Sequence, residues 1–386
     1  MRTSLISIVI LLFAISCSHS KKETPNTTDT SAEKKVATPE PEMKPAPVTE
    51  KKPEPEVKKP VVPPPPPKKD EATLNKEYWE TGTGPLAQKY VDIINTIDAK
   101  PTKAGQPEHY YVSNEHYYHL WYPYLKGLGG AYIGLAADTS YSLIVESGAK
   151  LVFLVDWDFE VNRTHQLFGI MLGLTNTPKE FIEYFKKKYN KKILEVANSK
   201  YDKKTADFIG YLHRRAANFI VKHHQTRLRL HKKGKASNYW LSDQKMFDAI
   251  KKVFAENRVF IFPGNLKDGD TITKIANICK KMNITVRTVY MSNAEEFWTY
   301  PAAFKASMLA LPTDAKSVFL RTVVLEPKYS IGYKFHYTIQ SGPDFLTWMR
   351  KKETGFSIKH IARKWRKPID NTKYFSRLPA APEKGI

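Results

Sequence analysis

The chain has 386 residues, 41% of them hydrophobic, with seven Trp and a formal net charge of +22. This length suits one large domain or two ordinary ones, and the apolar share excludes a chain that is disordered throughout. The positive charge favours anionic partners such as lipid headgroups, lipopolysaccharide phosphates or nucleic acid, and it says little about the fold.

The N-terminus has the pattern of a bacterial lipoprotein signal peptide. A short charged start is followed by an apolar run from Leu5 to Ile15. This run is shorter than the roughly 20 apolar residues that a transmembrane helix needs. The run ends in Ala14-Ile15-Ser16-Cys17, which resembles a lipobox. We expect residues 1–16 to be removed and Cys17 to carry the acyl chains that anchor the protein in a membrane. The alternative is an ordinary signal peptide with an incidental Cys.

Two further residues qualify this prediction. Ser18, rather than Asp, follows the lipidated position, and under the enterobacterial sorting pattern this favours the outer membrane. We therefore expect a cell-envelope protein. The only other cysteine is Cys279, so no disulfide can form within an acylated chain. Cys279 is expected to pack in the core, and the alternative is a disulfide with another chain.

A Pro/Lys/Glu-rich segment follows, which we assign as a disordered tether over residues 17–72. It cannot bury a core, and its prolines favour extended polyproline II. At about 3.1 Å per residue, some fifty residues reach roughly 150 Å. A passive tether is the simplest interpretation, and a peptidoglycan-spanning role is the alternative. Ser20 to Ala72 holds eleven Lys against ten acidic residues, so nearly all the net charge lies on the domain that follows.

That domain is expected over residues 73–386. Its first helix is predicted over Pro85 to Ile97 from apolar residues on one stripe. An aromatic run then carries His116 and His119, whose spacing could place two imidazoles on one helical face. No third ligand of suitable spacing is evident, so we expect aromatic packing around these histidines and no metal site.

A strand-turn-helix-strand unit organises the next part. Gly129 to Asp138 is predicted to be a short buried strand with a small-residue turn, and Tyr141 to Ala149 a helix. Lys150 to Asp158 is a continuous apolar strand that ends on acid. This is the plan of a βαβ unit that binds a dinucleotide or nucleoside, where the turn approaches the ligand and the acid holds ribose hydroxyls.

Helices are predicted over Phe159 to Leu174, Pro178 to Tyr189 with Thr177 as N-cap, and Thr205 to His231. For the last helix we expect a buried stripe of Phe208, Ile209, Leu212, Ala216, Phe219 and Ile220. The rest of its surface is expected to be basic, with Arg214, Arg215, Lys222, Arg227, Arg229, Lys232 and Lys233. Such a face is usually plain solvent-exposed surface, and binding of an anionic polymer is the alternative. Without interleaved aromatic residues for base stacking, nucleic acid is an unlikely partner.

A second βαβ unit is predicted from Arg258 to Met291, with a loop over Pro263 to Asp270 and a Ser-Asn turn after its second strand. The simplest interpretation of that turn is a capping box between Ser292 and Glu295. Both loops would nevertheless lie at the carboxyl ends of parallel strands, where open α/β sheets bind ligands. The resulting site candidates are Asn265, Asp268, Ser292, Asn293 and Glu295.

The remaining elements complete a single α/β domain. Val318 to Leu325 and Gly332 to Gln340 are predicted strands that form an antiparallel edge of the sheet. Short helices are expected over Phe345 to Arg350 and Ile358 to Trp365, the latter basic enough to lie on an anionic surface. We therefore expect a Rossmann-like, mostly parallel sheet flanked by helices.

Two groups of segments resemble a known family. The first is Tyr111-Val112-Ser113-Asn114-Glu115 with Gly130-Ala131-Tyr132-Ile133-Gly134 and Val155-Asp156. The second is Val289-Tyr290-Met291-Ser292-Asn293-Ala294-Glu295 with Leu311-Pro312-Thr313-Asp314 and Ser317-Val318-Phe319-Leu320-Arg321. The chain resembles an uncharacterised family of bacterial proteins, some of them lipoproteins. The fold of that family is similar to class I S-adenosylmethionine-dependent methyltransferases.

The resemblance implies S-adenosylmethionine over Gly134 to Ala136, with its ribose on Asp156 or Asp158. The sequence departs from active methyltransferases in two ways. Its turn is Gly-Leu-Ala-Ala, with fewer glycines than usual, and it has no motif of the Asn-Pro-Pro-Tyr type. An exported domain is also separated from the cytoplasmic cofactor pool.

Two hypotheses follow. The first is a lipid-anchored envelope protein whose basic, non-catalytic domain binds an anionic surface or a small ligand, with Gly134, Asp156, Asp158, Asn265, Ser292 and Asn293 as binding residues. The second is an enzyme of the methyltransferase type that uses S-adenosylmethionine, with Glu115 and Glu295 as candidate general bases. A Ser-His-Asp hydrolase is not indicated, because no Gly-x-Ser-x-Gly elbow occurs.

Overall fold

The computed structural model describes residues 69–100, 109–136, 138–332, 334–383 and 385. The predicted signal peptide, Cys17 and most of the predicted tether lie outside the described residues. The residues from Pro66 to Ile386 group into one compact unit. Its first helix, α1 (Glu71–Thr81), starts two residues before the expected boundary at 73.

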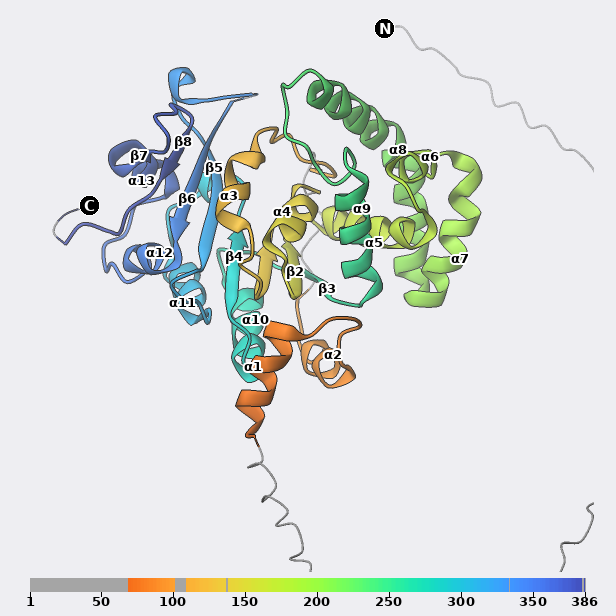
Figure 1. The fold of residues 1–386 in the computed structure, drawn as a ribbon, viewed down its shortest axis with the longest axis horizontal. Coiled ribbons are helices and arrows are strands. Elements are labelled where there is room, and N and C mark those ends of the chain that lie inside the picture. Colours follow the sequence, from red (N-terminus) through yellow and green to blue (C-terminus); the bar gives the residue numbers. More distant parts are fainter. Residues whose placement is uncertain (1–68, 101–108, 137, 333, 384, 386) are drawn as a thin grey trace, which may run out of the picture. The chain divides into compact units, whose positions relative to one another are not determined.

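An eight-stranded sheet forms the centre of this unit, in the order β3-β2-β1-β4-β5-β6-β8-β7 (Figure 1). The first five strands are parallel, and their order is that of the doubly wound dinucleotide-binding fold. β6 pairs antiparallel with β5, as predicted. The strands are β1 (Ala131–Gly134), β2 (Leu151–Asp156), β3 (Val259–Pro263), β4 (Val286–Tyr290), β5 (Val318–Val324), β6 (Phe335–Ser341), β7 (Lys367–Pro368) and β8 (Phe375–Arg377).

Helices cover both faces of the sheet, so the hydrophobic core has two halves. Tyr132 of β1 belongs to one half and its neighbour Ile133 to the other, because successive strand residues point to opposite faces. The half around Tyr132 is completed by η1 (Tyr118–Trp121), α3 (Tyr122–Leu125), α4 (Thr139–Ser147), α5 (Phe159–Leu174), α6 (Pro178–Glu183), α7 (Asn190–Lys200), α8 (Lys203–Lys232) and α9 (Gln244–Ala255). In Figure 1 the green helices α6–α8 lie on the opposite side of the view from the blue strands β6–β8.

The half around Ile133 contains the first two and the last four α-helices of the described residues. These are α1, α2 (Gln88–Asn95), α10 (Asp270–Lys281), α11 (Ala302–Ala310), α12 (Gly342–Met349) and α13 (Ile358–Trp365). Cys279 of α10 is fully buried in this half, which is where the sequence placed it. Short 3-10 turns η2 (Lys187–Tyr189), η3 (Ala294–Phe297) and η4 (Pro327–Tyr329) complete the inventory.

Local chemistry explains the ends of several helices. Thr177 accepts a hydrogen bond from the backbone N–H of Glu180 and caps α6, as predicted. Asp202 caps the 30-residue α8 through the backbone N–H of Thr205. The predicted helix over Pro178 to Tyr189 is too long, because α6 ends at Glu183. The short strands β7 and β8 were not predicted. Within the described ranges, no helix combines the length and hydropathy that crossing a bilayer requires.

Candidate functional site

The carboxyl ends of β1, β2 and β4 meet at one edge of the sheet. Gly134, the last residue of β1, pairs with Leu154 of β2 and Tyr290 of β4. The turn after β1 therefore lies between Asp156, which ends β2, and Ser292, which follows β4. The chain crosses over between β1 and β4, and open α/β sheets bind ligands at such a switch point. The sequence-predicted residues on these three strands are thus brought to a common edge.

Glu115 is the centre of a buried hydroxyl cluster at this edge. Its carboxylate accepts hydrogen bonds from Tyr290 Oη at 2.6 Å, Ser292 Oγ at 2.8 Å and Thr322 Oγ1 at 2.6 Å. It thereby ties the segment before η1 to the ends of β4 and β5. Burial raises the pKa of Glu115 above its ordinary value, and the three hydroxyl donors oppose that rise. Two candidates that the sequence proposed separately, Glu115 and Ser292, therefore form one hydrogen-bonded pair.

Two non-glycine residues of this edge adopt the left-handed backbone conformation. Ala136, in the turn after β1, has a φ of 59°, and Ser292, in the turn after β4, has a φ of 51°. Residues other than Gly are uncommon in this region, which costs of order 1–3 kcal/mol when the surrounding structure imposes it. Both turns of the switch point therefore have an unfavourable backbone conformation held by their surroundings.

The carboxylate of Asp156 is engaged by backbone within the domain. Oδ2 accepts the N–H of Ala136 and Oδ1 accepts the N–H of Asp158, both at 2.8 Å. The side chain is only 8% exposed, and burial raises its pKa to about 7. The resemblance to methyltransferases implies that Asp156 holds ribose hydroxyls. In this structure its carboxylate instead joins the turn after β1 to the turn after β2.

Gly134 is packed tightly by its own strand. A Cβ added to it would meet the ring of Tyr132 and the hydroxyl of Ser140. Tyr132 is fully buried, and within the described residues its hydroxyl has no hydrogen-bond partner. An aromatic ring thus lies over the glycine that the resemblance places beneath S-adenosylmethionine.

Asp158 belongs to a separate cluster at the start of α5. It caps that helix by accepting the N–H of Glu160, and its other oxygen lies 2.9 Å from Nδ1 of His109. Nε2 of His109 lies 3.3 Å from Glu160, which also binds Arg215 at 2.9 Å. Tyr111 donates to Glu160 as well. The sequence indicated only Asp158 as a site residue. Tyr111 entered as part of a segment that carries the resemblance, and Arg215 as part of a basic helix face.

Glu295 lies on the opposite face of the sheet from Glu115. It accepts a hydrogen bond from Tyr300, and its other oxygen is 3.7 Å from Arg321, which is buried in β5. Arg321 precedes Thr322, the partner of Glu115, so alternation along β5 puts the two acids on different faces. These two candidate bases therefore do not act on one substrate group. The predicted capping box is absent too, because η3 follows Asn293 without a side-chain cap.

The last three candidates, Asn265, Asp268 and Asn293, have local roles. Asp268 is exposed and accepts the N–H of Asp270 two residues on. Asn265 is exposed after β3 and accepts the N–H of Lys267 two residues on. Asn293 donates to Glu296 at 3.2 Å.

His119, one of the two spaced histidines, bonds Ser237 through Nδ1 at 2.7 Å. Throughout the described ranges, no group of three or more His, Cys, Asp or Glu side chains is placed to hold a metal ion.

Comparison with known proteins assigns the family. Residues 110–378 match a domain of unknown function, DUF7790. The chain belongs to this family. Every site candidate except Cys17 falls inside the matched DUF7790 region. No curated protein matches the sequence.

Helix α8 of the DUF7790 domain contains two residues that the sequence pattern placed wrongly. Phe219, expected in the buried stripe, is 56% exposed, and Arg227, expected on the surface, is 1% exposed. Arg227 follows Ile220 by seven residues, or two helical turns, so the two share a face. That spacing was the available signal for its burial.

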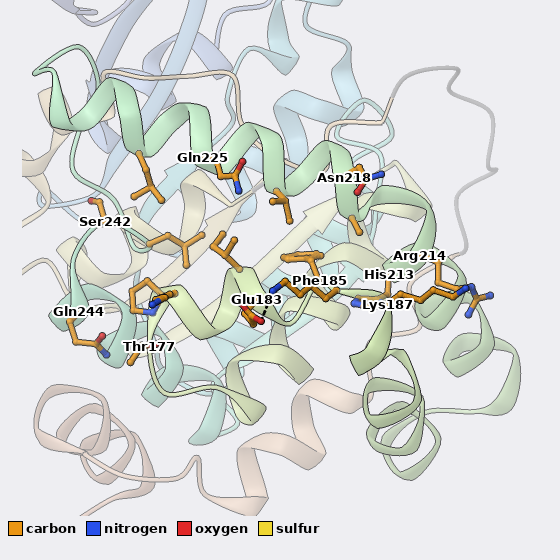
Figure 2. Close-up of a pocket in the computed structure, with 18 residues that line it drawn as sticks. Thr177, Glu183, Phe185, Lys187, His213, Arg214, Asn218, Gln225, Ser242 and Gln244 are labelled. Carbon is orange, nitrogen blue, oxygen red and sulfur yellow. Dashed lines mark hydrogen bonds and ion pairs between the residues drawn. The ribbon is translucent and has the colours of Figure 1, made fainter.

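A pocket of about 1020 Å³ lies in the DUF7790 domain between α6, α8 and α9 (Figure 2). Apolar side chains from α6 and α8 line it, including Ile182, Val221 and Leu228, while Lys179 and Arg214 stand among its polar lining residues. None of the sequence-predicted site residues lines it. A mostly apolar pocket with cationic side chains suits an amphiphile with an anionic head.

Proposed function

We propose that this protein is a lipid-anchored protein of the bacterial cell envelope whose basic Rossmann-like domain docks on anionic lipid headgroups. The anchor in this proposal is Cys17, within the lipobox-like segment, and the Pro/Lys/Glu-rich segment between Cys17 and α1 is the tether. The docking element is the exposed face of α8. The proposal assigns binding, without turnover, to the domain.

The observation that carries the proposal is the composition of that exposed face. Two aromatic rings stand out of it, Tyr211 at 44% exposure and Phe219 at 56%. From Phe208 to Lys232 the helix contains no acidic residue. Its exposed cationic side chains are Arg214, Arg215, Lys222, Arg229 and Lys232. Exposed aromatic rings beside arginine and lysine are typical of helices that lie in a membrane interface.

The charge of the domain and the length of the tether indicate that the surface bound by α8 is an anionic membrane. Nearly all of the net charge of +22 belongs to the domain, so an anionic surface attracts it at long range. A polyproline-like tether of some fifty residues leaves the domain free to reach the surface of the membrane that holds the anchor. The pocket beside α8, with apolar walls and cationic side chains, would accept part of a lipid at the same surface.

Vesicle co-sedimentation tests this proposal. The full chain with Cys17→Ser, which cannot be acylated, is mixed with phosphatidylethanolamine vesicles with and without phosphatidylglycerol. We expect binding only to the anionic vesicles, weakening as salt rises because the interaction is electrostatic. The double variant Phe219→Ser, Lys222→Gln should bind less. The matched control, Lys280→Gln, Lys281→Gln on exposed positions of α10, should bind nearly as wild type. Equal binding to neutral vesicles, or equal loss in the control, would refute docking through α8.

A methyltransferase of the S-adenosylmethionine-dependent type is the second candidate. The strand order and the acid at the end of β2 favour it. Against it stand the backbone hydrogen bonds to both oxygens of Asp156 and the Tyr132 ring over Gly134. Calorimetry with S-adenosylmethionine and S-adenosylhomocysteine decides between the two. The absence of heat with either, in folded protein, would end this alternative.

A further inference from the structure

Arg227 is a buried cation without a hydrogen-bonding partner. Its side chain is 1% exposed, and no described residue hydrogen-bonds to Nε, Nη1 or Nη2. No described carboxylate lies within ion-pair distance of it. Burial disfavours its charge, although the buried carboxylate of Asp138 attracts it and raises its pKa. Burying a charge without partners costs several kcal/mol in real proteins, so such a group needs an explanation.

Two tyrosine rings pack against the guanidinium. The guanidinium carbon lies 4.5 Å from the ring centre of Tyr118, in η1, and 4.5 Å from that of Tyr239, in the loop after α8. Such cation–π contacts compensate part of the buried charge. The N–H groups of a guanidinium lie along its edge, and no described residue supplies an acceptor to this edge of Arg227.

The neighbours of this edge are unsatisfied as well. Both ring nitrogens of His224 and the hydroxyl of Tyr118 lack a hydrogen-bond partner within the described part of the chain. Nδ1 of His224 is 3.9 Å from Oδ2 of Asp138, which is too long for a hydrogen bond. Asp138 itself already accepts from the N–H of Ser113 and from Trp240 Nε1, each at 3.0 Å. It therefore cannot turn to Arg227 without losing those donors.

The hydrogen-bonding groups of Arg227 and His224 indicate which kind of ligand could bind between them. A guanidinium edge offers parallel N–H donors that match two oxygens of a phosphate or carboxylate. Burial lowers the pKa of His224 to about 3, so its imidazole is neutral and offers one donor and one acceptor. The acceptor nitrogen suits an oxyanion that still carries a proton. Phosphate keeps a proton near neutral pH, whereas sulfate has none.

We propose that the free edge of the Arg227 guanidinium, beside the two tyrosine rings, is a binding site for a phosphate group. Arg227 and Tyr118 donate to its oxygens, and His224 accepts its proton-bearing oxygen. The side chains of this cluster are closed to solvent, so the ion exchanges slowly and remains with the protein through purification. This site is independent of the exposed face of α8, because Arg227 points into the core.

Phosphorus content and thermal stability test the site in the full chain with Cys17→Ser. Dialysed protein is denatured and its released phosphate measured, with about one per chain expected. Protein refolded without phosphate is then melted with inorganic phosphate, glycerol 3-phosphate or sulfate. A ligand that binds only the folded state raises Tm by about 2 °C for each tenfold rise above its Kd in a domain of this size. We expect this with phosphate and not with sulfate.

Matched variants locate the effect. Arg227→Met should release no phosphate and show no dependence of Tm on phosphate, whereas Arg350→Met, at an exposed position after α12, should behave as wild type. A response to glycerol 3-phosphate without retained inorganic phosphate would support the site and indicate a phosphate ester, such as a lipid headgroup. The proposal is overturned if wild type retains no phosphate and responds to neither phosphate nor glycerol 3-phosphate. An equal response to sulfate would overturn it too. If Arg227→Met does not fold, the wild-type measurements still decide.

Discussion

Replacing Asp156 by Asn tests the role of the acid at the end of β2. Burial raises the pKa of this carboxyl from 3.8 to about 7, because the ionised form is poorly solvated. The folded state thus binds the proton more tightly than the unfolded chain. The stability that the neutral carboxyl contributes is fully present below pH about 4 and is lost as pH rises through 7.

The size of the effect follows from the shift. About three pKa units correspond to about 4 kcal/mol over the whole range, of which roughly 2–3 kcal/mol is lost between pH 5 and pH 8. Asn does not titrate, but its amide offers one oxygen to the two N–H donors of Ala136 and Asp158. One donor loses its acceptor at a cost of about 1–3 kcal/mol at every pH. Asp156→Asn should therefore be clearly less stable than wild type at pH 5 and nearly equal to it at pH 8.

Urea unfolding at both pH values, on the full chain with Cys17→Ser, measures this difference. Asp248→Asn, which makes the same chemical change at an exposed position of α9, is the control and should leave the pH dependence unaltered. A free-energy difference between wild type and Asp156→Asn that is the same at pH 5 and pH 8 would refute the reasoning. The carboxyl would then have an ordinary environment, open to a ligand.

Three further changes probe the same sheet. Gly134→Ala pushes a methyl group into the ring of Tyr132 and should destabilise by about 1–3 kcal/mol in urea unfolding, and an unchanged midpoint would contradict that packing. Glu115→Ala leaves the hydroxyls of Tyr290, Thr322 and Ser292 without their acceptor, the first two of them fully buried, so a loss of about 3 kcal/mol or more is expected, and a loss below about 1 kcal/mol would contradict the cluster. Arg321→Met alone should cost about 3–5 kcal/mol, and adding Glu295→Gln should recover much of it, since the carboxylate is then no longer buried unpaired. Additive losses would contradict that pairing.

Much of the fold follows from pattern. The continuous apolar runs that became β1 and β2, and the periodic segments that became α5 and α13, have lengths and spacings that allow one interpretation. Because parallel strands end at one edge, the sequence also brought Asp156 and Ser292 to the same region. The short strands β7 and β8 carry too few residues to show a period.

The errors have physical reasons. Phe219 lies at the margin of the buried stripe of α8, where only the packing of the neighbouring elements decides exposure. Arg227 was assigned to the surface by its charge, although its helical position favoured burial. Glu295 was grouped with Glu115 as a candidate base because its turn follows a parallel strand, while the partner of each acid is set by the alternation of β5. None of these contacts is visible within a local window.

The strand order also has a consequence for synthesis of the chain. β1 is an interior strand of the sheet, yet one of its two neighbours, β4, begins at Val286, more than 150 residues after β1 starts. Until β4 is made, one backbone edge of β1 is unpaired, on a strand whose residues are all buried in the finished domain. Such an edge is a template for pairing between chains. Non-local parallel pairing of this kind is slow. Fragments that stop before β4 should therefore aggregate, whatever the stability of the finished domain.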